Sequence, residues 1–218
     1  MIEDAQTLPA ISTTDPEKYW IQMHGGNPFV YGSVDNDVSI HDIAHHLSLV
    51  CRFSGATTYH YSVAQHSVMV AQAVDQRDPL LRMYALLHDA HESVLGDIPT
   101  PASQYLASVA GYDWVEYIKL AADEAILTQL GLTYPVPSTI KAKVKVADIQ
   151  AFVTEASQIL QNVPYWLDRY PYKPLDVRIE PMTPGAAKEL FIREYNSISK
   201  ALGLATRTRN DRTRKTAA

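Results

Sequence analysis

Four residues of metal-binding types are spread over the middle of this chain. His88 and Asp89 are adjacent in the segment 83–92, which has an apolar face at helical spacing. An imidazole and a carboxylate in an apolar wall must be paired, bind a metal or serve chemistry, because an unpaired buried charge is costly. His66 and Asp148 lie in two further segments with helical patterns. Together the four residues form a candidate ligand set for one divalent ion.

The ligand types narrow the choice of metal and suggest a reaction. Imidazole nitrogens and carboxylate oxygens suit Mn, Fe, Co, Ni or Zn, whereas Mg fits less naturally beside histidines. We therefore expect Co, Mn or Zn as cofactor, with Mg as an alternative. Glu92 lies four residues after His88, which predicts that both project from one helix face, one turn apart. A carboxylate beside the ion but not bound to it is the usual general base in metal-assisted hydrolysis.

Spacing by itself leaves a simpler interpretation open. His-Asp pairs are common, and a lone histidine such as His24, His60 or His91 is more often a satisfied surface or core residue than a ligand. The group His41, His45 and His46 could likewise be the polar face of a helix.

The candidate ligands need several helices to bring them together. Ser62 and Gln65 form a capping box, and the pairs Asp78-Pro79 and Thr183-Pro184 each supply an N-cap followed by a proline at N1. Helices are predicted from residue 39 onward, over 62–74, from 78 to about 94, over 102–109, over 113–130, from 138 to about 160, and from 183 to about 202. The expected fold is all-α, a helical bundle with the metal site at its centre.

Composition divides the chain into three parts. Residues 1–38 contain Pro, Gly and aromatic residues without periodicity and predict an irregular arm, residues 39–203 form the helical domain, and residues 204–218 form a basic tail. The tail holds five of the 19 basic and one of the 24 acidic residues, so the rest of the chain has 14 basic and 23 acidic residues. We expect the tail to be disordered and solvated. An acidic body argues against binding of duplex nucleic acid.

Other sequence features predict a cytoplasmic protein. No apolar run approaches the roughly 18–20 residues that cross a bilayer, and residues 1–6 carry two acids and no basic residue. The single cysteine, Cys51, cannot form an internal disulfide, which fits a reducing compartment.

The candidate residues resemble the HD-domain metal-dependent phosphohydrolases. The resemblance rests on His66, His88-Asp89, Asp148, Glu92 and the loop Gly-Asp-Ile-Pro-Thr-Pro over 96–101. The stretches 40–53 and 61–66 look most like the compact HD proteins of bacteriophages, among them dATP triphosphohydrolases, and like the bacterial 5′-deoxynucleotidases. The resemblance covers about residues 39–152, and a phage origin would place the protein in the host cytoplasm.

The resemblance assigns a role to each matching residue. It implies that His66, His88, Asp89 and Asp148 ligate the metal ion. Glu92 matches the catalytic acid that orients or deprotonates the attacking water, and Asp97 matches a second acid near the site. Arg52 matches an arginine that contacts phosphate, a task that suits the guanidinium fork, and Phe53 follows where a bulky residue packs on the nucleoside.

The resemblance implies a deoxynucleotide substrate, of which two forms compete. A triphosphohydrolase would release a deoxynucleoside and tripolyphosphate from a dNTP, and the likeness to the phage enzymes favours dATP. A 5′-deoxynucleotidase would instead remove phosphate from a dNMP. Related phage sequences often have a lysine after the Pro-Thr-Pro loop, where this chain has Ala102-Ser103-Gln104, so triphosphate preference is open.

Two further alternatives concern class and assembly. A catalytically silent HD domain that binds a nucleotide is the alternative of another class, although intact acids and histidines argue against it. Compact HD proteins commonly associate, so a homo-oligomer is also open.

Overall fold

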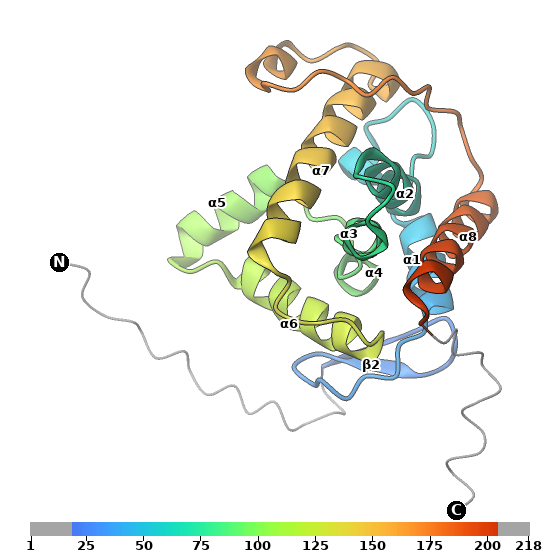
Figure 1. Ribbon diagram of the computed structural model, residues 1–218. Coiled ribbons are helices and arrows are strands. Elements are labelled where there is room, and N and C mark those ends of the chain that lie inside the picture. The colour runs from blue at the N-terminus through green and yellow to red at the C-terminus, as the bar shows by residue number, and fades with distance from the viewer. Residues whose placement is uncertain (1–18, 205–218) are drawn as a thin grey trace, which may run out of the picture.

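The computed structural model describes residues 19–204, which form a bundle of helices with one short hairpin (Figure 1). The hairpin pairs β1 (Trp20–Gln22) antiparallel with β2 (Pro28–Val30), with Ile21 opposite Phe29. The helices are α1 (Ile40–Leu49), α2 (Val63–Ala73), α3 (Pro79–Leu86), α4 (Glu92–Leu95), α5 (Thr100–Ala110), α6 (Trp114–Gln129), α7 (Ser138–Ile159) and α8 (Pro184–Leu202), with 3-10 turns η1 (Arg52–Gly55) and η2 (Tyr165–Arg169). The predicted all-α class is confirmed.

Local capping chemistry sets the ends of several helices. The Ser62 hydroxyl accepts the Gln65 N–H at 3.2 Å, and the Gln65 side chain accepts the Ser62 N–H in return, so the predicted capping box opens α2. The Thr183 hydroxyl accepts the Ala186 N–H and so caps α8, without a return bond. Gly203 ends α8 in a left-handed conformation, φ 66°, which a residue without Cβ adopts at little cost. These predicted helix ends are confirmed.

The single helix predicted from residue 78 to about 94 is wrong in its second half. α3 ends at Leu86, and a turn leads to α4. If the helix continued, the Asp89 N–H would donate to the Ala85 carbonyl. Here the ring Nδ1 of His88 lies 2.8 Å from that carbonyl. The Glu92 N–H instead reaches Asp89 O, an i to i+3 bond. His88 and Asp89 therefore lie in a tight turn and not on a buried helix.

The parts predicted at the two ends are described only in part. The hairpin belongs to the predicted arm over 1–38, whose first 18 residues lie outside the described residues. Of the basic tail over 204–218, the structure describes only Leu204.

α2 is the centre of the bundle. It packs against α1, α3, α7 and α8, and Figure 1 shows α2 and α3 enclosed between α7 on one side and α1 and α8 on the other. Residues 63–68 of α2 are all buried, and the core around them includes Leu47 of α1, Leu86 of α3 and Phe191 of α8. His66 is thereby carried to the middle of the protein. Among the helices of residues 19–204, none combines the length and apolarity that a bilayer crossing requires.

Candidate metal centre

The four predicted ligands converge on one point from three elements. His66 comes from α2, His88 and Asp89 from the turn after α3, and Asp148 from α7. The Nε2 atoms of the two histidines are 3.2 Å apart. His66 Nε2 lies 3.5 Å from Asp89 Oδ2 and 3.3 Å from Asp148 Oδ1. His88 Nε2 lies 3.1 Å from Asp89 Oδ2 and 3.8 Å from Asp148 Oδ1. Ligand atoms on one tetrahedral ion with bonds of about 2.1 Å lie roughly 3.4 Å apart. His66, His88 and Asp89 each offer a ligand atom within 4.8 Å of the others, and Asp148 lies beside both histidines, so the donor set fits a divalent ion.

The charges around the two histidines favour a positive charge between them. Burial opposes protonation of His88, but Asp89 and Asp148 outweigh burial and raise its pKa well above its usual range. For His66, burial and Arg52 oppose the charge, yet Glu155 and Asp148 still raise the pKa. Burial would raise the pKa values of Asp89 and Asp148, but the histidines beside them lower both. A divalent cation suits such surroundings as well as protons do.

Glu155 of α7 supports His66 from behind. Its Oε1 lies 2.6 Å from His66 Nδ1 and accepts the Tyr61 hydroxyl at 3.0 Å, while its Oε2 accepts the Arg52 Nε–H at 3.1 Å. The carboxylate is fully buried. Burial opposes its charge, but Arg52 and His66 lower its pKa. A carboxylate that accepts Nδ1–H leaves the lone pair on Nε2 and fixes the ring for metal binding.

The sequence does not identify this role of Glu155. Its position two turns after Asp148 places it on the inward face of α7, which the helical spacing does indicate. That spacing cannot name its partners, which come from residues 52, 61 and 66.

Arg52 and Phe53 lie at the edge of the site, in η1. One Arg52 Nη lies 3.6 Å from Asp89 Oδ2, and the guanidinium stands 5.7 Å from the centroid of the Phe53 ring. Phe53 has φ 54°, a strained conformation for a residue with a side chain, costing on the order of 1–3 kcal/mol. The strained backbone sets its ring on Phe152 of α7, with centroids 5.6 Å apart and planes within 19°. Arg52 therefore lies beside the ligand set, and Phe53 packs next to Arg52 against Phe152.

Glu92 and Asp97 add two acids next to Asp89. One carboxylate oxygen of Glu92 lies within 4.8 Å of one from Asp89, and Glu92 is buried at the start of α4. Burial, then Asp89 and Asp97, raise the pKa of Glu92 well above its usual range. Burial and Asp89 also raise the pKa of Asp97, against Arg52. Glu92 is thus a buried carboxyl group near the ligand set that holds a proton more tightly than a free glutamate does.

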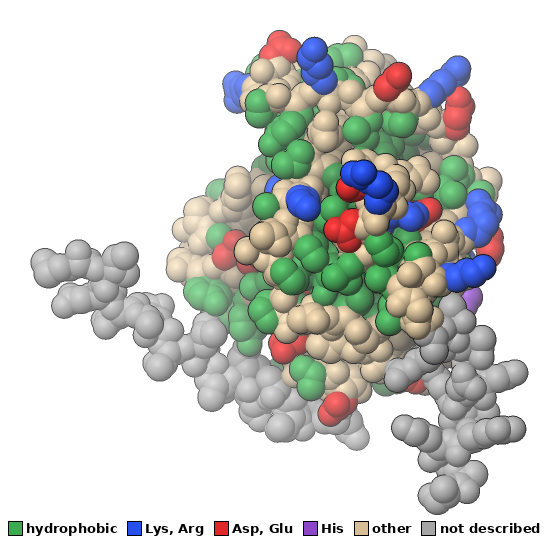
Figure 2. Space-filling model, viewed as in Figure 1, with side chains coloured by type: hydrophobic (Ala, Val, Ile, Leu, Met, Phe, Trp, Pro, Cys, Tyr) green, Lys and Arg blue, Asp and Glu red, His purple; other side chains and the backbone are tan. Residues whose placement is uncertain are grey.

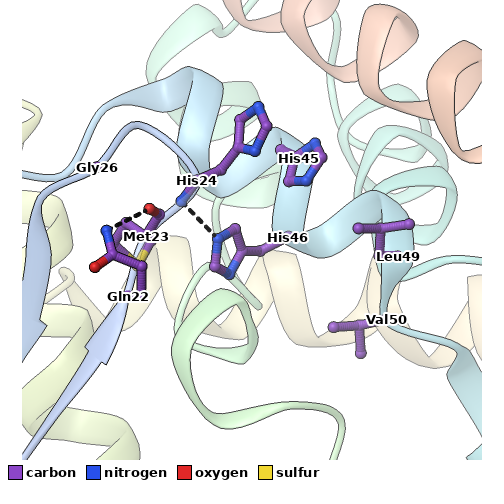
Figure 3. A pocket seen from close by; sticks show the side chains of 8 residues that line it. All are labelled: Gln22, Met23, His24, Gly26, His45, His46, Leu49 and Val50. Carbon is purple, nitrogen blue, oxygen red and sulfur yellow. Dashed lines mark hydrogen bonds between the residues drawn. The ribbon is translucent and has the colours of Figure 1, made fainter.

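The histidines of α1 do not join this site. His46 Nδ1 lies 2.9 Å from the Ser93 carbonyl, and its Nε2 accepts the His24 N–H at 3.1 Å, so the ring ties the hairpin to α4. The His24 and His45 rings are stacked at 3.6 Å. Figure 3 shows the three histidines along an open hollow of about 540 Å³ between the hairpin and α1. These contacts connect the hairpin with α1 and α4, so the three histidines have a structural role.

Comparison with known proteins assigns the chain to a family without assigning a function. No family model matches the sequence. The chain is 31% identical over 185 residues to the uncharacterized protein YfdR of Escherichia coli K12, an alignment that covers 83% of this chain and 96% of YfdR. The chain belongs to the YfdR family. An uncharacterized protein of Rhodobacter capsulatus is 35% identical over 180 residues, 76% of this chain and 88% of that protein.

Proposed function

We propose that this protein is an HD-type, divalent-metal-dependent phosphohydrolase that acts on deoxynucleotide phosphate esters. The observation that supports it most is that His66, His88, Asp89 and Asp148 come together from three elements of the bundle, with the two histidine Nε2 atoms 3.1–3.8 Å from each other and from the carboxylates. An ion held there supplies a Lewis acid for the phosphoryl oxygen and lowers the pKa of water.

The chain's own groups complete the chemistry. Glu92 is buried beside Asp89, and in the proposed reaction its carboxylate takes a proton from the attacking water. The Nε of Arg52 is held by Glu155, and one terminal nitrogen faces Asp89 Oδ2 at 3.6 Å, beyond hydrogen-bond distance, so the guanidinium fork can still donate to a phosphate. Tyr61 and Glu155 fix the position of His66 and Arg52 at once. The site therefore holds a metal-ligand set, a base and a phosphate-binding cation.

A triphosphate is the substrate form that we favour. Lys145 of α7 lies at the mouth of the site, where its Nζ is 2.8 Å from Asp148 Oδ2, and its side chain is 67% exposed. Burial opposes its charge, but Asp148 raises its pKa, so the ammonium stays charged. Figure 2 shows lysine and arginine side chains interspersed with acids on the face that it draws. An exposed lysine on a flexible stem can reach the outer phosphates, a role for which residues 102–104, in the first turn of α5, offer no lysine.

The second candidate is a 5′-deoxynucleotidase. The missing lysine after the Pro-Thr-Pro loop favours it, because a monophosphate needs fewer cations than a triphosphate. The same metal ligands, Glu92 and Arg52 would serve.

Product analysis decides among the candidates. The protein, loaded in turn with Co, Mn, Zn or Mg, is incubated with the four dNTPs and the four dNMPs, and the products are separated by ion-exchange chromatography. We expect deoxyadenosine and tripolyphosphate from dATP; release of orthophosphate from dNMPs alone would support the nucleotidase instead. Asp148→Asn serves as the inactive control. Nucleotide binding without any product would establish a silent binding module and refute the proposal.

A further inference from the structure

The loop between α7 and α8, residues 160–183, brings aromatic side chains onto α7 (Figure 1, orange). Loops longer than about 12–15 residues with little secondary structure of their own are usually functional. Hydrogen bonds anchor the second half of this loop: the Leu175 N–H donates to Thr154 Oγ1 at 2.8 Å, and the Ile179 N–H donates to Gln158 Oε1 at 3.0 Å. The first half contains η2, which has no buried residue and meets α7 through aromatic rings.

Three of these rings lie in nearly parallel planes and lead away from Arg52. Phe53 stacks on Phe152 of α7, with centroids 5.6 Å apart and planes within 19°. Phe152 in turn stacks on Trp166 of η2, at 5.5 Å and 18°. Such centroid distances are those of offset aromatic stacks. Because the Arg52 guanidinium lies 5.7 Å from the Phe53 centroid, the row of rings begins beside the proposed phosphate-binding group.

Tyr170 is inclined to this row and reaches the mouth of the site. Its ring makes an angle of 57° with Phe152 and 70° with Trp166, at centroid distances of 5.2 and 6.1 Å. Tyr170 also lies within electrostatic reach of the Lys145 ammonium. It is 38% exposed, whereas the two rings that hold it are half-buried. Tyr170 therefore has a fixed ring with accessible surface.

One face of α7 connects these rings with the ligand set. Lys145, Asp148 and Phe152 follow one another at spacings of three and four residues, which places them on the same side of the helix. Lys145 Nζ lies 2.8 Å from Asp148 Oδ2, and Phe152 lies about one turn beyond Asp148, roughly 6 Å along the axis. The deoxyribose of a nucleotide separates base and phosphate by a comparable distance. A base can thus lie at the rings while its phosphate lies at the ligand set.

We propose that Tyr170 stacks on the base of the nucleotide, and that Phe152 and Trp166 hold its ring at the mouth of the site. The identity of the ligand as a nucleotide rests on the proposed function. Stacking uses the π face that every base has, and a purine offers the larger face. The subsite therefore favours purine over pyrimidine nucleotides, and Tyr170 is a specificity-determining residue.

Quenching of 2-aminopurine fluorescence tests the stack without turnover. This adenine analogue loses fluorescence when it stacks on an aromatic ring. The full chain, loaded with Mn²⁺, is titrated with 2-aminopurine deoxynucleoside triphosphate and monophosphate, and every sample carries Glu92→Gln to slow hydrolysis. We expect saturable quenching in this parent. Tyr170→Ala should abolish most of it and weaken affinity roughly 5- to 150-fold, the size of one base–aromatic stack.

Three further variants control for the fold. Tyr170→Phe keeps the ring and should bind as the parent does. Tyr165→Ala removes a neighbouring tyrosine of η2 that is 83% exposed, and it should also bind as the parent does. Trp166→Ala should weaken binding and Trp166→Phe should restore it, because a ring at this position is enough to support Tyr170. Circular dichroism checks that each variant is folded.

A ligand without a base separates a base contact from a general effect on the site. Isothermal titration calorimetry with inorganic tripolyphosphate should give the same affinity in the parent and in Tyr170→Ala. For nucleotides, the loss of affinity in Tyr170→Ala should be larger for dATP and dGTP than for dCTP and dTTP, since the smaller pyrimidines lose less stacking area.

The outcomes distinguish this proposal from the proposed function. Absence of quenching in the parent, equal binding in a folded Tyr170→Ala, or equal losses for dATP and tripolyphosphate would each overturn the subsite. Hydrolysis of nucleotides alongside any of these results leaves the proposed function standing. Quenching that depends on Tyr170, without hydrolysis of any nucleotide by the wild type, would support the subsite and refute the function.

Discussion

His66 and Glu155 are joined at 2.6 Å between Nδ1 and Oε1, although 89 positions separate them in the chain. The contact links α2 to α7 and sets the ring of a predicted ligand from behind. Glu155 also accepts from Tyr61 and Arg52, so one buried carboxylate holds both His66, the predicted metal ligand, and Arg52, the residue that we propose binds phosphate.

Removal of a ligand should abolish both metal binding and activity. His88→Ala or Asp89→Ala should lose the bound ion and all measurable turnover, while helix content by circular dichroism stays close to the wild type. The thermal midpoint measured with metal present should fall, because an ion that binds only the folded form stabilises it. Near wild-type turnover with metal retained would show that the ligand assignment is wrong.

The base can be separated from the ligands. Glu92→Gln should keep the ion held by His66, His88, Asp89 and Asp148 and still lose about a hundredfold or more in kcat, the typical size of a general acid–base contribution. Metal content and kcat are measured on the same sample. Loss of the bound ion in this variant would make Glu92 a ligand.

Arg52 should contribute mainly to phosphate recognition. Hydrogen bonds to charged groups contribute about 1.5–3 kcal/mol, so Arg52→Ala should lower kcat/KM roughly 10- to 100-fold. Arg52→Lys should recover part of the loss, because an ammonium keeps the charge but not the fork. Arg77→Ala, an exposed arginine paired only locally with Asp75, is the control in steady-state assays with dATP and dAMP. Unchanged kinetics on both nucleotides would remove Arg52 from the site.

Glu155→Gln should weaken the metal site without removing a ligand. The amide keeps the size of the side chain but lacks the charge that orients His66, so affinity for the ion should fall about 10- to 100-fold. Competition with a chelator of known affinity measures the change. Equal affinity in wild type and variant would show that Glu155 serves folding alone.

The metal-free protein should lose stability as pH rises above about 4.5. Burial and the neighbouring acids raise the pKa of Glu92 above its unfolded value, so between the two values the folded state binds the extra proton. The free energy of unfolding then falls with rising pH until the folded pKa is passed. Denaturant titrations of chelator-treated protein between pH 4.5 and 8 should show this fall relative to Glu92→Gln, and parallel curves would contradict it.

The sequence by itself determined the helical class, most helix ends and the candidate ligands. Capping is local chemistry: Ser62 with Gln65 and Thr183 with Ala186 make their bonds within one turn, so neighbouring residues suffice to predict them. The sequence also indicates the candidate ligands, because histidine and aspartate residues interrupt otherwise apolar faces. These residues are His66, His88, Asp89 and Asp148.

Tertiary structure alone decided the break after Leu86 and the partners of Glu155 and His91. Apolar spacing continues through the buried Leu87, so periodicity cannot reveal that His88 takes the Ala85 carbonyl and turns the chain. Glu155 and Asp123 reach their histidines from other helices, across 89 and 32 positions. Such contacts depend on how α2, α6 and α7 pack around the turn, and packing is a property of the whole core that no local pattern encodes.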